Sequence, residues 1–170
     1  MTKNPALDQH EIHRRLYLLW MTNVPTSYKL PPNSFRISMP NIAIVLGSFH
    51  KKEVTAMLEE ARKAASEHGL TIVEEVWVHG SIEKPLALKR LLMRDDLHGA
   101  VTLGIIERGS TKHGMVMGEV VYDAIIRLQL EFMKPIGLGI LGPEILPEQI
   151  EPRLLPYARE AVIATAQMLA

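Results

Sequence analysis

Residues 100–132 read AVTLGIIERGSTKHGMVMGEVVYDAIIRLQLEF, and this stretch predicts a strand, a polar loop and a helix in direct succession. The apolar run at residues 100–106 is typical of a strand whose two faces are both buried. Helical periodicity then begins at residue 116 and continues to residue 132. A buried strand that passes directly into a helix is the unit of parallel α/β sheets, so this stretch favours the α/β class.

The same alternation of strands and helices extends along most of the chain. Further strands are expected at residues 42–46, 70–78 and 136–141. The expected helices cover residues 51–68, 83–94, 116–132, 144–151 and 157–169. Pro152 and Pro156 separate the last two, because proline usually ends or kinks a helix. Since crossovers between parallel strands are right-handed, we expect a three-layer α/β/α sandwich with a central, mostly parallel four-stranded sheet.

The first forty residues lack this alternation. Residues 9–21 carry a short helical stripe of apolar side chains, and four prolines interrupt residues 24–40. We therefore expect residues 1–40 to form an N-terminal helix and an extended arm, and residues 41–170 to form the α/β domain. Residues 35–39 could add an edge strand, and an arm with so little core of its own is expected to lie on a neighbouring subunit.

Composition excludes several classes of function. The 170 residues carry 19 Lys and Arg against 19 Asp and Glu, so the basic excess of a nucleic-acid-binding protein is missing. No apolar run approaches the roughly 20 residues of a membrane-spanning helix, and no secretion signal opens the sequence, so a cytoplasmic protein is expected. The absence of cysteine excludes disulfides, thiolate metal sites and cysteine nucleophiles.

The candidate site is expected beyond the carboxyl ends of the strands, where open parallel sheets bind their ligands. The segments that reach this edge are residues 47–50, 79–83, 105–113 and 142–144. Residues 105–113 are the most informative, because glycine, hydroxyl side chains and a helix start together suit a phosphate group. His113 at the end of this segment can exchange protons near neutral pH.

Three of these segments resemble one known family in the same order along the chain. Residues 47–50 (GSFH) match its pattern of glycine, any residue, phenylalanine and a polar residue, and residues 78–85 (VHGSIEKP) are similar to its V-P-G-A-F-E-I-P loop. Residues 108–113 (RGSTKH) match R-G-x-T-x-H. The chain therefore resembles the lumazine synthase (6,7-dimethyl-8-ribityllumazine synthase) family over roughly residues 41–168.

The resemblance implies a flavodoxin-like α/β fold and an enzyme of riboflavin biosynthesis. Members condense 5-amino-6-(ribitylamino)pyrimidinedione with 3,4-dihydroxy-2-butanone 4-phosphate and release phosphate, without metal or organic cofactor. They assemble as homopentamers or multiples of pentamers. Neither nucleic acid nor a membrane is an expected partner. His10 and His13 share a helical face, but the sequence shows no third metal ligand beside them.

The resemblance also assigns roles to individual residues. His113 would shuttle protons, Ser110 and Thr111 would bind the substrate phosphate, and Arg153 from an adjacent subunit would assist them. Phe49 would stack on the pyrimidine ring. The residues implied to contact the pyrimidine and its ribityl chain are Phe49, Ser81, Ile82, Glu83, Ile105, Ile106, Glu107 and Leu138.

The departures from the family pattern concentrate in the half that would recognise the pyrimidine. They are His79 for proline, Ile82 for an aromatic residue, Lys84 for an apolar residue, Glu107 for a small residue and Leu138 for a residue that is often aromatic. Two alternatives therefore stay open: a divergent paralogue that uses another amine, and a non-catalytic oligomeric shell or flavin-binding protein. Thr111, His113 and Arg153 argue against the second alternative, because a shell needs none of them.

Overall fold

Residues 39–170 are described by a computed structural model, in which strands and helices alternate. The elements are β1 (Asn41–Gly47), α2 (Lys51–Glu67), β2 (Thr71–Val78), α3 (Lys84–Leu92), β3 (Gly99–Glu107), α4 (His113–Phe132), β4 (Ile136–Ile145) and α5 (Pro147–Leu169). The helix, arm and edge strand expected within residues 1–40 fall almost entirely outside the described residues. Among the described residues, no helix is both long and apolar enough to cross a membrane.

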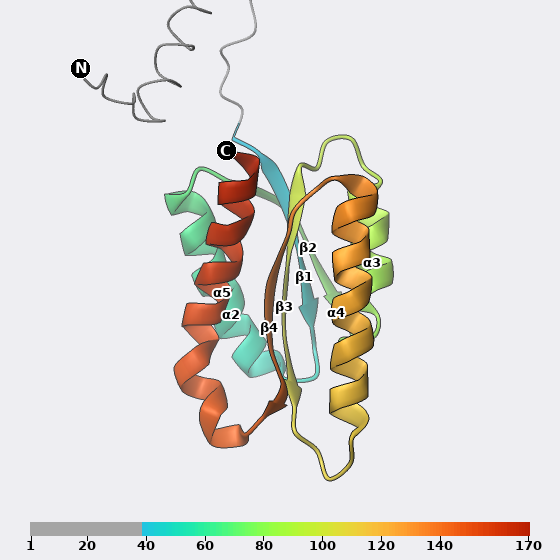
Figure 1. The fold of residues 1–170 in the computed structure, drawn as a ribbon. Helices are drawn as coiled ribbons and strands as arrows, with labels where there is room; N and C mark the ends of the chain where they lie inside the picture. Colours follow the sequence, from blue (N-terminus) through green and yellow to red (C-terminus); the bar gives the residue numbers. More distant parts are fainter. Residues whose placement is uncertain (1–38) are drawn as a thin grey trace, which may run out of the picture. The chain divides into compact units, whose positions relative to one another are not determined.

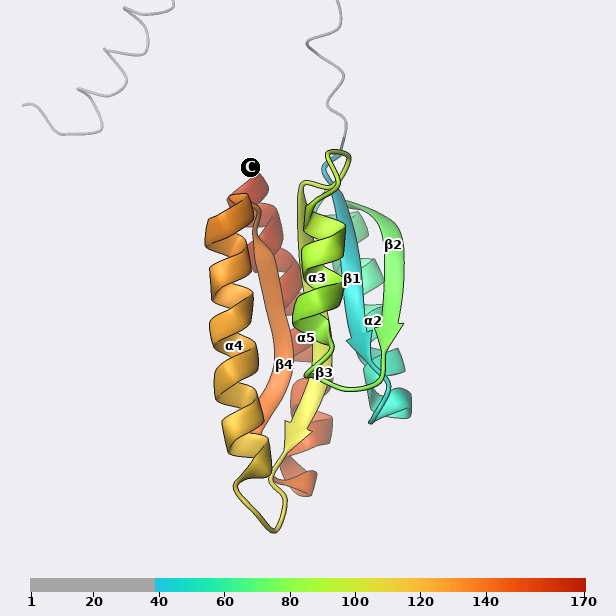
Figure 2. The ribbon, with the colours of Figure 1, turned by 90° about the vertical axis from the view of Figure 1, so that its right-hand side faces the viewer.

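The four strands form one sheet in the order β2-β1-β3-β4, and all three pairs are parallel. Helices α2 and α5 cover one face of this sheet, and α3 and α4 cover the other (Figure 1). The view turned by 90° shows the strands running in one direction, with a loop leaving the end of each (Figure 2). The expected three-layer α/β/α sandwich is confirmed.

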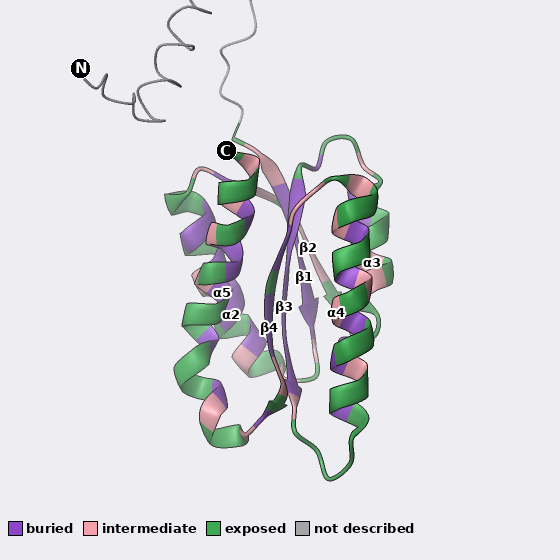
Figure 3. Cartoon of the chain, in the orientation of Figure 1, coloured by how far each residue is buried: buried purple, intermediate pink, exposed green. Residues whose placement is uncertain are grey.

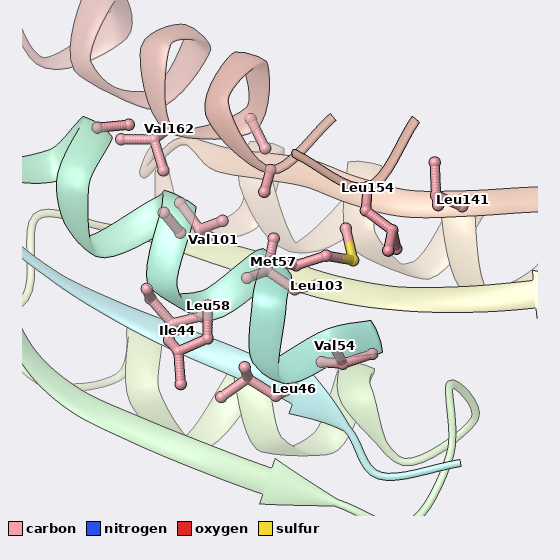
Figure 4. Close-up of a cluster of buried hydrophobic side chains, with 14 of the residues drawn as sticks. Ile44, Leu46, Val54, Met57, Leu58, Val101, Leu103, Leu141, Leu154 and Val162 are labelled. Atoms are coloured by element: carbon pink, nitrogen blue, oxygen red, sulfur yellow. The ribbon is translucent and has the colours of Figure 1, made fainter. Parts of the chain in front are cut away.

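The two central strands carry the core because helices cover them on both sides. Ile44 and Leu46 of β1 face α2 and α5, whereas Ala43 and Val45 face α3 and α4, and all four are fully buried. This explains why β1 appears in the sequence as an uninterrupted apolar run. Buried residues follow β1 and β3 along their length (Figure 3), and Figure 4 shows side chains of α2 and α5 packed over them.

The contact between β4 and α5 depends on a glycine. A methyl group at Gly137 would overlap the carbonyl oxygen of Ala161 and the hydroxyl of Thr165. The helix therefore lies closer to the strand than any larger residue would allow. The Thr165 hydroxyl donates a hydrogen bond to the carbonyl oxygen of Ala161 at 2.9 Å, which satisfies it within the helix.

The C-terminal region differs from the prediction. Instead of two helices, α5 is one helix that continues through Pro152 and Pro156, and β4 extends to Ile145. Both prolines lie on the exposed side, whereas the buried positions keep helical spacing along the whole of α5. Those positions are Ile150, Leu154, Ala158, Ala161, Val162 and Thr165. Packing on α2 and the sheet thus outweighs the hydrogen bonds that the prolines remove.

Candidate active site

The site lies where β1 and β3 separate at their carboxyl ends. Pairing between these strands ends at Leu46 and Leu103, whereas β1 stays paired with β2 up to Gly47 and Val78. The Ser48 N–H then donates to the carbonyl oxygen of Val78 at 2.9 Å, which draws the chain further toward β2. Since the sheet order changes direction between β1 and β3, this crevice is the position at which open α/β sheets bind ligands.

A cavity of about 420 Å³ occupies this crevice. Its wall comes from the ends of β1 and β3, the two loops that follow β2 and β3, and the first turn of α4. The lining residues are Gly47, Phe49, His50, His79, Gly80, Ser81, Ile82, Glu83, Ile105, Ile106, Glu107, Gly109, Ser110, Thr111, His113, Gly114 and Met117. A cavity of this size is large enough for a small polar molecule.

Most of the residues expected at the site line this one cavity. They are Phe49, Ser81, Ile82, Glu83, Ile105, Ile106, Glu107, Ser110, Thr111 and His113. Two expected residues, Leu138 and Arg153, do not line the cavity. Leu138 lies within β4 opposite Thr102. Arg153 lies exposed on α5, where its Nη1 donates a hydrogen bond to the carbonyl oxygen of Gln149 at 3.0 Å. The expected segment 142–144 is also outside the wall, because β4 is the edge strand beyond β3.

The loop between β2 and α3 is held by its own hydrogen bonds. The Glu83 carboxylate accepts a hydrogen bond from the Gly80 N–H at 2.7 Å, and the Ser48 hydroxyl donates to the carbonyl oxygen of His79 at 3.1 Å. Ser81 is buried, whereas Ile82 is exposed at the mouth. A carboxylate has several acceptor positions, so Glu83 can hold the loop and still receive hydroxyl groups from a ligand.

The loop between β3 and α4 presents donors suited to an anion. Helix α4 begins at His113, three residues earlier than the sequence pattern indicated. The first N–H groups of a helix have no partner within it, and they carry a partial positive charge. The hydroxyls of Ser110 and Thr111 precede them on an exposed loop, and Thr111 Oγ1 lies 3.4 Å from the His113 nitrogen. Groups of this kind are suited to an anion, and the His113 imidazole lies beside them.

An aromatic residue and a histidine–carboxylate contact lie at the other side of the cavity. The Phe49 side chain is 69% exposed, and its ring meets the His50 ring edge-on, with 5.1 Å between centroids. His50 Nε2 lies 3.3 Å from Glu107 Oε2, so this pair joins the ends of β1 and β3. This contact of His50 could not be predicted, although His50 directly follows Phe49, because its partner Glu107 is distant along the chain.

A buried lysine lies at the base of the same crevice. Lys84 is 0% exposed, and its Nζ donates to the carbonyl oxygen of Leu103 at 2.7 Å. Leu103 is the last residue of β3 that pairs with β1, so the lysine amine occupies the point at which the two strands part. Burial lowers the pKa of Lys84 to about 7.

The described residues contain no group of three His, Cys, Asp or Glu side chains that could hold a metal ion. The donors present are instead hydroxyls, amides, a carboxylate, imidazoles and an aromatic ring. A parallel sheet that gathers such groups at its change of strand order defines an α/β enzyme that acts on a small polar substrate.

Comparison with known proteins identifies the family. The sequence profile of one family, described as 6,7-dimethyl-8-ribityllumazine synthase, matches residues 39–170. A 6,7-dimethyl-8-ribityllumazine synthase of Methanopyrus kandleri is 38% identical over 128 residues, which cover 75% of this chain and 90% of the relative. Proteins of the same name from Staphylothermus marinus and Picrophilus torridus are each 37% identical over 131 residues, 77% of this chain and 87% and 96% of theirs. The chain therefore belongs to the 6,7-dimethyl-8-ribityllumazine synthase family, and the resemblance seen in the sequence is confirmed.

Proposed function

We propose that this protein is an active 6,7-dimethyl-8-ribityllumazine synthase of riboflavin biosynthesis, formed by the α/β domain of residues 41–170. The reaction condenses 5-amino-6-(ribitylamino)pyrimidinedione with 3,4-dihydroxy-2-butanone 4-phosphate and releases phosphate and water. One observation carries the proposal: a single cavity brings together Phe49, Glu83, Thr111 and His113, although they come from three separate parts of the chain.

The two halves of the cavity suit the two substrates. On one side, Phe49 stacks on the pyrimidine ring and Glu83 accepts hydrogen bonds from the ribityl hydroxyls. On the other side, Ser110, Thr111 and the start of α4 bind the phosphate of the ketone. This arrangement holds the amine of one substrate against the carbonyl carbon of the other, which lowers the entropic part of the barrier.

His113 then moves the protons that the chemistry requires. The amine adds to the ketone and loses water to give an imine, and loss of a proton from the adjacent carbon allows phosphate to leave. The second nitrogen then adds to the carbonyl group that forms after phosphate has left, and the ring closes with loss of a second water. An imidazole at the phosphate end of the site is placed to take the carbon proton and to return it to the leaving groups. The proposed reaction requires neither metal nor cofactor.

The site is completed by a neighbouring subunit in this proposal. Arg153 is exposed on α5 and outside the cavity of its own chain, which supports its contribution to the phosphate site of an adjacent subunit. Helix α4 also carries a stripe of exposed apolar side chains on the side away from its buried face. That stripe consists of Met115, Val116, Val120, Ile126 and Leu130. These apolar side chains are interspersed with the exposed Glu119, Asp123 and Arg127, but they suit a contact with a neighbouring subunit, so we propose a homopentamer or a multiple of it.

Within the assembly, Leu138 and the arm of residues 1–40 are further candidates for contacts between subunits. Leu138 is 41% exposed on the edge strand β4. We propose the cytoplasm as the place of the reaction, because a chain without cysteine gains no disulfide from an oxidising compartment.

A divergent enzyme that uses another amine is the second candidate function. The His50–Glu107 pair favours it, because these polar groups lie near Phe49, where the pyrimidine is proposed to bind. Such a pair could select an amine with different hydrogen-bonding groups on its ring. The phosphate and proton-transfer half would be the same in both functions.

The test is to mix purified protein with both standard substrates and to follow the fluorescence of the lumazine product. We expect a rate well above that of the spontaneous reaction in a protein-free control. A parallel series replaces the pyrimidine by related diamines that lack the ribityl chain or carry different ring substituents. If a substitute diamine is turned over and the standard pyrimidine is not, the divergent function is correct and the standard one is wrong.

A further inference from the structure

Lys84 connects the loop between β2 and α3 to the central strands. Its backbone N–H donates a hydrogen bond to the carbonyl oxygen of Ser81 at 3.2 Å, and Glu83 directly precedes it in the chain. Its side chain is buried, and Nζ donates to the carbonyl oxygen of Leu103 at 2.7 Å. One residue therefore links two residues of the cavity wall, Ser81 and Glu83, to strand β3.

Two glycines make the space for the lysine amine. A methyl group at Gly104 would overlap Lys84 Nζ, and one at Gly47 would lie 3.4 Å from both Nζ and Cε. The same point beside Gly104 is 3.9 Å from the Ser81 hydroxyl. Lys84 itself does not line the cavity, whereas Gly47 and Ser81 do, so the lysine can influence a ligand only through its neighbours.

A stabilising role does not account for a lysine at this position. Lys84 shares the buried face of α3 with Leu88, Leu91 and Leu92, where another apolar side chain would pack without electrostatic cost. Removal of an ammonium group from water is compensated poorly by one hydrogen bond to a neutral carbonyl. What the amine adds is direction, because a hydrogen bond fixes one donor against one acceptor and an apolar contact does not.

We propose that Lys84 is a positioning residue for the amine substrate, on which it acts through Ser81 and Glu83. The proposal rests on the proposed function, because it takes the ribityl chain as the ligand of this loop. The hydrogen bond to Leu103 fixes the start of α3 against β3. The turn of residues 80–84, in which the Glu83 carboxylate also accepts from the Gly80 N–H at 2.7 Å, then presents Glu83 to the ribityl hydroxyls. The loop between β3 and α4, where the phosphate is proposed to bind, contains no residue of this turn.

The first test compares the steady-state kinetics of full-length Lys84→Met and wild-type protein, with each substrate varied in turn. We expect the KM for 5-amino-6-(ribitylamino)pyrimidinedione to rise by about 3- to 10-fold, the loss of one hydrogen-bonded constraint. The KM for the phosphorylated ketone and kcat should stay within about 2-fold of the wild type. Lys89→Met replaces an exposed lysine of the same helix and should react as the wild type does. An unchanged KM for the pyrimidine, or an equal rise for both substrates, overturns the proposal.

The second test displaces the amine without replacing the lysine, and it decides alone if Lys84→Met does not fold. Gly104→Ala puts a methyl group where Lys84 Nζ lies, and the other atoms near that methyl group are at least 3.4 Å away. It should raise the KM for the pyrimidine as Lys84→Met does. In the double variant the methyl group fills the space that the amine has left, so the two effects should not add. Additive effects, or a wild-type KM in Gly104→Ala, overturn the proposal.

The positioning role and the proposed function can be told apart when one of them fails. Lumazine formation above the protein-free rate, with an unchanged KM for the pyrimidine in both variants, removes only the positioning role of Lys84. A wild-type protein that forms no lumazine above that rate removes the proposed function, and the positioning role is overturned with it.

Discussion

Lys84→Met should make the protein more stable at neutral pH. Lowering the pKa of Lys84 from 10.5 to about 7 corresponds to roughly 5 kcal/mol of unfavourable burial, at about 1.36 kcal/mol for each pKa unit. Methionine removes this cost and fills similar apolar space, but it leaves the carbonyl oxygen of Leu103 without its donor. An unsatisfied buried acceptor costs about 1–3 kcal/mol, so the net gain at pH 7 should be roughly 2–4 kcal/mol.

The gain should depend on pH in a defined direction. Because the pKa of Lys84 is lower in the folded than in the unfolded protein, the unfolded wild type binds more protons between about pH 7 and pH 10.5. Wild-type stability therefore rises with pH across this window. At pH values below the window, the full cost of burying the charged lysine remains. The advantage of Lys84→Met should accordingly be greatest at pH 7 and below, and by pH 10, where little of the charge-burial cost remains, the unsatisfied carbonyl should leave the variant less stable than the wild type.

Thermal unfolding followed by circular dichroism measures this difference. At pH 7 the melting temperature of Lys84→Met should exceed that of the wild type by roughly 5–15 °C for a domain of this size. Lys89→Met, which removes an exposed lysine paired with Glu131 at 3.2 Å, should change stability by no more than about 1 kcal/mol. A lower melting temperature for Lys84→Met at pH 7, or a difference that stays constant up to pH 10, would refute the reasoning.

Three further variants test other parts of the structure. His113→Ala should keep the circular dichroism spectrum and lower the rate of lumazine formation by about 10²–10⁴, and an unchanged rate would remove His113 from proton transfer. Arg153→Ala should raise the KM for the phosphorylated ketone by about 10- to 100-fold and change that for the amine much less, since charge-assisted hydrogen bonds contribute roughly 1.5–3 kcal/mol. Equal losses for both substrates would indicate a structural role. Gly137→Ala should destabilise the fold by at least about 1–3 kcal/mol in denaturant unfolding, because its methyl group overlaps α5. Gly109→Ala, where a methyl group meets no atom within 4 Å, is its control and should unfold like the wild type.

The sheet and most of the cavity wall could be predicted because their signals are local. Strands buried on both faces give uninterrupted apolar runs, as in β1 and β3, and the loops after parallel strands must meet at one edge of the sheet. The loops were therefore expected near one another, and within them the resemblance to the family singled out Phe49, Glu83 and His113.

Features that depend on distant contacts were not predicted. His50 and Glu107 are adjacent only because β1 and β3 are neighbours, and neither residue indicates the other in the sequence. The continuity of α5 through its prolines follows from packing against α2, which local propensity does not contain. Lys84 did carry a signal, since it shares helical spacing with Leu88 and Leu91, and this spacing places it on the buried face of α3.

The most direct measurement of the central claim is the ratio of phosphate released to lumazine formed when the wild-type protein acts on both standard substrates. Inorganic phosphate and lumazine fluorescence are recorded in the same reaction, with a protein-free mixture subtracted. We predict equal amounts of both products at a rate above the spontaneous reaction. Lumazine formation that stays at the protein-free rate, or phosphate release without lumazine, would contradict the assignment of this site.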